Sequence, residues 1–322
     1  MITGVHHIGV SVANIAATRS ALGAALTLDD ARSFEAKNSA AVQALFQLPD
    51  VDASVSLLRG PNVFLELFDF RAPAPAPSRW RAPNESGITH ICIQSRKGDD
   101  VAQRCTAAGI DFFAPMTGLG GDYRYAYGRA QELMIEVEDA AYAPTDPSTW
   151  IGHVAFATSD LERLARFYAD LVGAEPEFSP RLRGHRALDV VTGLKDVDVR
   201  AAWVHGLNIG LEFWCYSNPP TGKRLDRRPI NEAGYSHVCF ETVDMEAAFA
   251  RALALGAAPH AEPQILGGAV AAYLRDPDGN IVELLQWRDA GARLSLASAP
   301  HLDVLTRMKA ARAAHHQEQA AQ

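Results

Sequence analysis

The sequence repeats itself once, at an offset of 146 or 147 positions, and no other feature restricts the fold as strongly. The segment Arg81–Cys92 recurs as Arg228–Cys239, with Asn, Glu, Gly, His and Cys at matching places. A period of this length is too long for a solenoid and indicates a duplicated domain. We place one domain at 1–139, a second at 150–290, and a C-terminal helix and tail at 291–322.

Each half divides again into two similar units. A unit begins with an apolar run of strand character, continues with helical periodicity, and ends in short apolar runs separated by Gly, Pro and Asp. The expected helices span about 14–26, 99–108, 159–172 and 244–255, and glycines follow the last three within a residue. The sequence therefore predicts an α+β fold of two tandem domains, built from four βαβββ modules.

A histidine or a glutamate lies inside each of eight predicted strands. They are His7, Glu66, His90 and Glu136 in the first half and His153, Glu212, His237 and Glu283 in the second half. Because side chains alternate along a strand, each points away from the apolar residues that pack on the helices. Two imidazoles and two carboxylates that converge on one sheet face suit Zn, Mn, Fe, Co or Ni. The alternative is a set of hydrogen-bonded polar residues on a solvated face.

One full set of four ligands falls in each half, so we expect the units to pair within the halves. The first unit would then pair with the second, and the third with the fourth, and each pair would form one cleft. Histidines without a counterpart in the other half are expected to be structural or exposed. These are His6, His185, His205 and His260.

At these residues the sequence resembles the vicinal oxygen chelate superfamily, which includes glyoxalase I, methylmalonyl-CoA epimerase and type I extradiol dioxygenases. The most specific segment is Tyr273–Glu283, where an Asp-Pro-Asp-Gly-Asn turn leads into the last strand. The matching segment Tyr127–Glu136 keeps the tyrosine and the glutamate but has lost the turn. We therefore expect the C-terminal site to be the active one. The resemblance implies paired βαβββ modules whose curved mixed sheets enclose metal clefts.

The resemblance implies three reaction classes. In isomerases and lyases of the glyoxalase and epimerase type, four protein ligands hold the metal. That metal polarises a carbonyl or chelates an enediolate, while a carboxylate moves the proton. In extradiol dioxygenases two His and one Glu bind Fe(II), which leaves a face for catechol and oxygen. In thiol transferases that inactivate fosfomycin, the metal binds a phosphonate.

We favour the isomerase or lyase class, because Glu66 and Glu212 occupy a fourth-strand ligand position that ring-cleaving enzymes do not use. The histidine that the extradiol signature places shortly before Tyr273 is also missing from 263–268. The predicted cofactor is a divalent metal, and the predicted catalytic residues are Glu212, Glu283 and Tyr273. The second candidate is an Fe(II) extradiol dioxygenase, and the third is a metal-free protein that binds or sequesters a small molecule.

Charge and hydropathy restrict the partners. The chain has 30 Lys and Arg against 38 Asp and Glu, a net charge of −8, which disfavours nucleic acids and anionic membranes. No apolar run approaches the 18 or so residues that span a bilayer, and no signal peptide is visible. We expect a cytoplasmic protein whose partner is a small-molecule substrate, with a homodimer as the alternative to a monomer.

Two basic segments could hold a carboxylate or phosphate of the substrate, or could be solvated loops. They are Arg79–Arg81 and Thr221–Arg228. The four cysteines form no C-x-x-C pair. Cys92 and Cys239 each follow a candidate ligand histidine by two residues, and we expect both to be small buried residues rather than nucleophiles.

Overall fold

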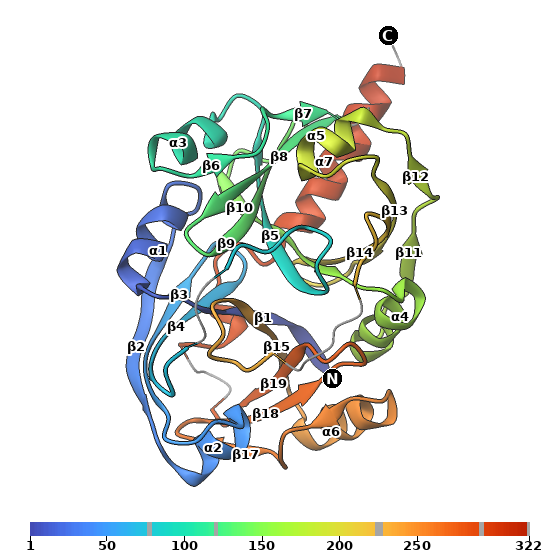
Figure 1. Ribbon diagram of the computed structural model, residues 1–322. Helices are drawn as coiled ribbons and strands as arrows, with labels where there is room; N and C mark the ends of the chain where they lie inside the picture. Colours follow the sequence, from blue (N-terminus) through green and yellow to red (C-terminus); the bar gives the residue numbers. More distant parts are fainter. Residues whose placement is uncertain (76–78, 119–121, 223–227, 290–292, 321–322) are drawn as a thin grey trace.

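The computed structural model describes residues 1–75, 79–118, 122–222, 228–289 and 293–320, and two curved mixed sheets lie side by side in it (Figure 1). Sheet A has the order β16 (Ala258–Pro259), β18 (Ala269–Arg275), β19 (Ile281–Trp287), β15 (Gly234–Thr242), β1 (Ile2–Ser11), β4 (Phe64–Ala72), β3 (Asp52–Arg59) and β2 (Asp29–Lys37), with β17 (Gln264–Leu266) on β18. Sheet B has the order β11 (Pro176–Phe178), β13 (Asp198–Val204), β14 (Gly210–Asn218), β10 (Thr149–Ala157), β5 (Gly87–Arg96), β9 (Leu133–Ala140), β8 (Tyr123–Ala130) and β6 (Asp111–Phe112), with β12 (Leu182–Arg183) on β13 and β7 (Thr117–Gly118) on β8.

Each sheet combines units from both halves of the chain, so the expected pairing within the halves is wrong. Strand β1 of the first unit pairs antiparallel with β15 of the fourth, and β5 of the second pairs antiparallel with β10 of the third. The second and third units follow each other directly, and the short connection from β9 to β10 places β10 beside β5. The first and last units then pair with each other.

Four helices and the C-terminal helix lie where the sequence predicts them, whereas two short α-helices, at 40–46 and 186–192, were not predicted. The helices are α1 (Ile15–Gly23), α2 (Ala40–Phe46), α3 (Val101–Ala107), α4 (Leu161–Val172), α5 (Arg186–Thr192), α6 (Met245–Ala254), η1 (Leu296–Ser298) and α7 (Val304–Ala320). In α4, the Asp160 side chain accepts a hydrogen bond from the Arg163 amide at 3.2 Å. Gly173 then ends the helix at φ +76°, a conformation that favours glycine.

One hydrophobic core joins the convex faces of the two sheets through α1, α3, α4 and α6. Tyr168 of α4 shows this best, since its ring contacts Phe156 and Phe213 of sheet B and Phe240 of sheet A, with centroids 5.0–6.1 Å apart. Because the convex faces carry this shared core, the opposite, concave face of each sheet encloses its own set of polar groups.

Two buried asparagines join the sheets, and they are related by the internal repeat. The Asn208 side chain accepts a hydrogen bond from the Val5 amide at 2.8 Å and donates to the Val5 carbonyl at 2.9 Å. The Asn62 side chain accepts from the Ile151 amide at 3.1 Å and donates to the Ile151 carbonyl at 2.8 Å. Each asparagine therefore hydrogen-bonds the backbone amide and carbonyl of a residue in the other sheet. That residue lies two positions before a candidate ligand histidine.

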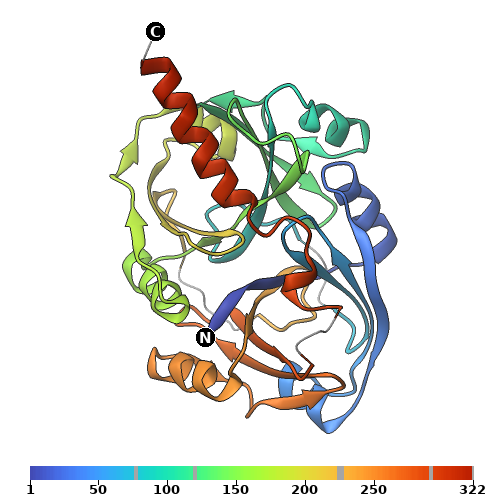
Figure 2. The same ribbon diagram turned by 180° about the vertical axis from the view of Figure 1, so that it is seen from behind.

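The C-terminal helix α7 lies across sheet B on the side seen in Figure 2. Val304 and Met308 pack with Trp150 of β10, and the more distal turns are mostly exposed. The apolar positions of the predicted C-terminal helix are therefore used for packing. In the part of the chain that the structure covers, no helix is both long and apolar enough to cross a membrane.

Candidate metal centres

The eight histidines and glutamates predicted as ligands form two groups of four, one on the concave face of each sheet. We call them site A, made of His7, Glu66, His237 and Glu283, and site B, made of His90, Glu136, His153 and Glu212. In each group the four candidate donor atoms lie within 4.8 Å of one another. All eight predicted residues therefore converge, but the membership of both groups differs from the expectation.

The correction has one physical cause. Parallel pairing within each unit brings His7 to Glu66 and His237 to Glu283, whereas the antiparallel pairing of β1 with β15 joins units that are far apart in sequence. Each site thus takes two ligands from each half. Glu283 and Tyr273 lie in sheet A, and Glu212 lies in sheet B, so the three predicted catalytic residues do not share a site.

In site A, the nitrogen and oxygen donors point at a common centre. Nε2 of His7 lies 3.0 Å from Nε2 of His237, 2.9 Å from Oε2 of Glu283 and 3.2 Å from Oε2 of Glu66. Nε2 of His237 lies 3.2 Å from the Glu283 oxygen and 3.6 Å from the Glu66 oxygen. Glu66 has the most exposed side chain of the four, at 13%.

Site B repeats this arrangement with small differences. Oε2 of Glu136 lies 3.0 Å from Nε2 of His90 and 3.1 Å from Nε2 of His153. Oε2 of Glu212 lies 3.1 Å from Nε2 of His153 and 3.8 Å from Nε2 of His90. Burial opposes ionisation of Glu136, but the two imidazoles outweigh it and lower the pKa of this carboxyl to about 2.

The residues fit a divalent metal. Ligands bound at about 2.1 Å around a tetrahedral centre lie about 3.4 Å from one another, close to the spacings in both sites. Oε2 of Glu283 is buried and accepts no hydrogen bond in good geometry among the described residues, although two imidazoles lie beside it. A buried carboxylate oxygen left this way is costly unless a cation completes its environment. The chain therefore carries two candidate metal centres.

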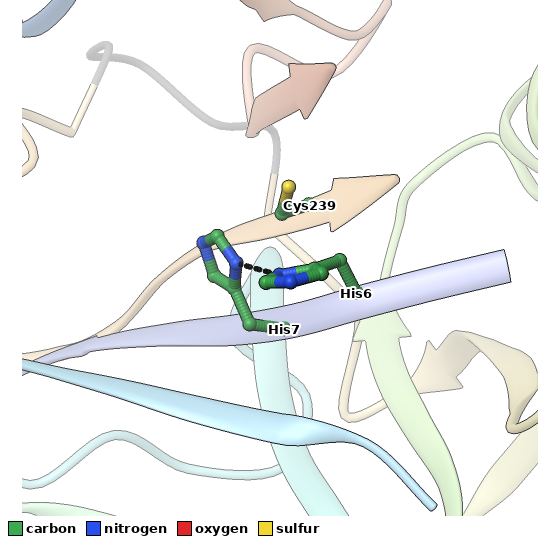
Figure 3. Close-up of side chains that lie close together, drawn as sticks. All are labelled: His6, His7 and Cys239. Atoms are coloured by element: carbon green, nitrogen blue, oxygen red, sulfur yellow. Dashed lines mark hydrogen bonds between the residues drawn. The ribbon is translucent and has the colours of Figure 1, made fainter. Parts of the chain in front are cut away.

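A second histidine supports His7 in site A, which the sequence analysis did not predict. The register of β1 against β15 shifts between Val5 and His7, so His6 is the extra residue of a β-bulge. Figure 3 shows the rings of His6 and His7 on the same side of β1, with Nδ1 atoms 2.7 Å apart and with Cys239 of β15 nearby. Burial and the neighbouring His7 lower the pKa of His6 to about 3, so His6 is neutral.

Two tryptophan side chains hold Glu212 of site B by hydrogen bonds. The sequence analysis did not predict these contacts either. Trp203 donates its indole N–H to Oε1 at 2.8 Å, and Trp214 donates to Oε2 at 2.6 Å. Trp214 follows Glu212 by two residues, so strand alternation places both on the same face. The positions that match the tryptophans in sheet A hold Leu57, opposite Glu66, and Phe68, two residues after it. The two sites thus share ligands but differ in what holds them.

Site B also carries an extra carboxylate, Glu138. Its Oε1 accepts a hydrogen bond from the Gln94 amide at 3.0 Å, and Gln94 in turn accepts from the Trp150 indole at 2.8 Å. Burial and the charge of Glu136 raise the pKa of Glu138 to about 8. The matching position in sheet A is Leu285, which packs in the hydrophobic cluster around Phe46, Phe68 and Tyr273.

Tyrosine and cysteine occupy equivalent places in the two sites. Tyr273 lies opposite Glu283 in register, and Tyr127 lies opposite Glu136. Burial, together with Glu283 and Glu136 respectively, raises the pKa of each phenol well above its usual range. Cys92 and Cys239 are buried, and burial raises the pKa of both thiols, so neither behaves as a nucleophile.

The predicted basic segments are occupied by ion pairs as far as they are described. Arg79 pairs with Glu85 at 2.7 Å, and Arg81, between β4 and β5, pairs with Glu232, between β14 and β15. Arg228 lies 3.3 Å from Glu232. Residues 223–227, the centre of the second basic segment, lie outside the described residues.

The chain belongs to the glyoxalase, bleomycin resistance protein and dioxygenase superfamily, and has the vicinal oxygen chelate fold. Two family models with this description match residues 6–127 and 150–284, which together make up most of the chain. A comparison with curated proteins found no match to the chain.

Solved structures show the same fold. Glyoxalase I from Zea mays is 19% identical with a TM-score of 0.60, over 88% of this chain and 92% of that chain. A putative dioxygenase from Bacillus subtilis is 14% identical with a TM-score of 0.55, over 96% of both chains. At these identities the likeness concerns the fold, so function must be argued from the two sites.

Proposed function

We propose that the chain is a metal-dependent isomerase or lyase that acts on a small molecule with two oxygen atoms placed to chelate the metal, one of them a carbonyl oxygen. The observation that carries this proposal is the position of Glu66 and Glu212. Their Oε2 atoms lie 3.2 and 3.1 Å from Nε2 of His7 and His153, so each site presents four donors. Fe(II) sites that activate oxygen typically use two His and one carboxylate. Four donors favour chemistry without a redox step.

A divalent ion held by these donors would polarise the substrate carbonyl and acidify the adjacent C–H bond. The residues around it must then bind the substrate, exclude water and move one proton. A carboxylate is the group in each site that can accept a proton from carbon and return it to a neighbouring atom.

We assign the proton transfer to Glu66 of site A rather than to Glu212. The two indole N–H groups on Glu212 stabilise its anionic form and fix its orientation, which makes it a weaker base and a firmer ligand. Leu57 and Phe68 stand at the matching places beside Glu66, and their side chains have no N–H to donate. Glu66 is therefore freer to rotate toward a substrate.

The lining of site A is suited to this role. Phe46, Phe68, Phe70 and Tyr273 pack together beside the candidate ligands, with ring centroids 5.5–6.2 Å apart. The Phe68 ring also contacts the His237 ring at 6.1 Å. An apolar lining limits the access of water to the reacting atoms and strengthens the electrostatic interactions among them. In this proposal site A is catalytic, and site B holds its metal more rigidly.

The test uses solvent exchange, because it requires only a substrate class. The protein is loaded with Zn, Co, Ni or Mn and incubated without oxygen in D2O, with thiol adducts of 2-oxoaldehydes and with α-branched acyl thioesters. We expect deuterium at the carbon next to the carbonyl, detected by NMR, with more than one metal. The Glu66→Gln variant lacks the proposed base and should exchange the proton far more slowly. No exchange with any compound would contradict the proposal.

The second candidate, an Fe(II) extradiol dioxygenase, is favoured only by Tyr273, which lies beside both His237 and Glu283. An oxygen electrode distinguishes the two candidates. Consumption of one O2 per catechol cleaved, with Fe(II) alone supporting activity, would replace the first proposal with the second. A protein that gains no metal on reconstitution would instead favour the third candidate, a metal-free binding protein.

A further inference from the structure

We propose that His6 is a positioning residue of site A: it holds His7 in the tautomer that carries its proton on Nδ1, and so raises the affinity of site A for a divalent metal. The inference rests on the metal site proposed above. It concerns a residue that contacts none of the reacting atoms and acts only through His7.

The direction of the hydrogen bonds carries the argument. Nε2 of His6 lies 2.6 Å from the carbonyl oxygen of Leu294, which can only accept, so Nε2 of His6 carries a hydrogen. Nε2 of His7 faces the other three ligands of site A and must present its lone pair there to bind a metal. Nδ1 of His7 then carries the hydrogen and donates it to Nδ1 of His6 at 2.7 Å.

The bulge and its surroundings hold His6 in place. Side chains one residue apart normally point to opposite faces, and the bulge is what brings His6 to the same side as His7. The His6 ring is 1% exposed and stacks on Phe64, with centroids 4.9 Å apart and planes 10° apart. Asn208 binds both backbone groups of Val5, the residue just before the bulge. His6 therefore has little freedom to turn its acceptor away from His7.

Site B is a natural comparison, because it has the same bulge without the histidine. The register of β10 against β5 shifts between Ile151 and His153, and the bulge residue is Gly152. A Cβ at Gly152 would lie 2.3 Å from the side chain of Gln94, so Gln94 fills the space that His6 takes in site A. The effect of His6 should therefore be confined to site A.

The experiment measures Zn²⁺ affinity by competition with a chromophoric chelator, one site at a time. His153→Ala silences site B, and in that background His6→Phe should weaken the binding of Zn²⁺ to site A by roughly 10–100-fold, the range for loss of such a partner. His6→Asn restores an acceptor near the Nδ1 position and should recover most of that loss. In a His7→Ala background, His6→Phe should leave the affinity of site B unchanged, which also shows that the variant is folded.

Each result decides the question. Unchanged affinity of site A in His6→Phe, or an equal loss in site B, would overturn the role of His6. Failure of His6→Asn to recover affinity would indicate packing rather than hydrogen bonding, and would overturn it too. Two Zn²⁺ ions bound at site A would make His6 and Cys239 ligands of a second ion instead. Absence of Zn²⁺ binding at both sites of the unchanged protein would overturn the metal site itself.

A measurement on the unchanged protein covers the case in which the variants do not fold. Nitrogen-15 NMR of the Zn²⁺-loaded chain should show a hydrogen on Nδ1 of His7 and on Nε2 of His6. A hydrogen on Nδ1 of His6 would contradict the assignment directly.

Discussion

Sites A and B have the same four ligand types on equivalent strands, yet they are held in different ways. In site A, His6 holds the candidate ligand His7 by a hydrogen bond, and the carboxylate Glu66 lies beside apolar residues. In site B, two indole N–H groups hold the carboxylate Glu212 by hydrogen bonds. A further carboxylate, Glu138, lies nearby and is hydrogen-bonded to Gln94. A duplicated domain can therefore keep its candidate ligands while the residues that support them differ between the two copies.

The largest expected effect separates the two glutamates. Glu66→Gln should lower the rate on the natural substrate by about 10²–10⁴-fold, because it removes the proposed base. Glu212→Gln should change that rate only a few-fold, since it removes a ligand of the other site. Rates are measured at saturating metal. The reverse order would move catalysis to site B, and equal losses would mean two working sites.

The grouping of the ligands predicts metal stoichiometry. His7→Ala and His237→Ala remove ligands from the same site, so their combination should bind one metal ion fewer than the unchanged protein. His7→Ala combined with His90→Ala damages both sites and should bind two fewer. Elemental analysis after gel filtration gives the counts. If the second pair lost only one ion, the two histidines would share a site and the fold described above would be wrong.

The indole bonds predict a smaller difference in affinity. Trp203→Phe removes the donor to Oε1 of Glu212 and keeps an aromatic ring, so the binding of Zn²⁺ to site B should weaken by about 10-fold. Competition titration in the His7→Ala background isolates this site. Trp287→Phe is the matched control, because Trp287 lies on β19 of sheet A, and the affinity of site B for Zn²⁺ should be unchanged in this variant. Equal affinities for both variants would mean that the indoles do not support the ligand.

Glu138 predicts the smallest effect, on stability in the metal-free protein. Its pKa is about 8 in the folded chain and near 4.5 in the unfolded chain, so the folded form retains a proton in this range that the unfolded form releases. The free energy of unfolding therefore falls as the pH rises from about 4.5 to 8. Glu138→Gln removes this contribution and should raise Tm more at pH 8 than at pH 5. An equal change at both pH values would show that Glu138 titrates normally.

Local patterns in the sequence were enough to predict the modules and the candidate ligands. Strand alternation places each of the eight candidate ligands opposite an apolar face, and capping residues such as Asp160 and Gly173 mark helix ends. The duplication itself is visible as an offset. These features depend on neighbours within a few residues or on simple identity, so a single sequence contains them.

Only the tertiary structure decided which units share a sheet, and hence which four ligands share a site. The edges of β1, β5, β10 and β15 offer similar backbone groups, and the sequence contains no local signal that ranks one antiparallel pairing above another. The bulge that turns His6 toward His7 is likewise a property of the paired strands, because alternation alone would place His6 on the opposite face. Trp203 and Glu212 meet only through the register of β13 on β14. Non-local pairing thus determined the composition and the support of both sites, whereas the sequence alone identified the eight candidate ligands.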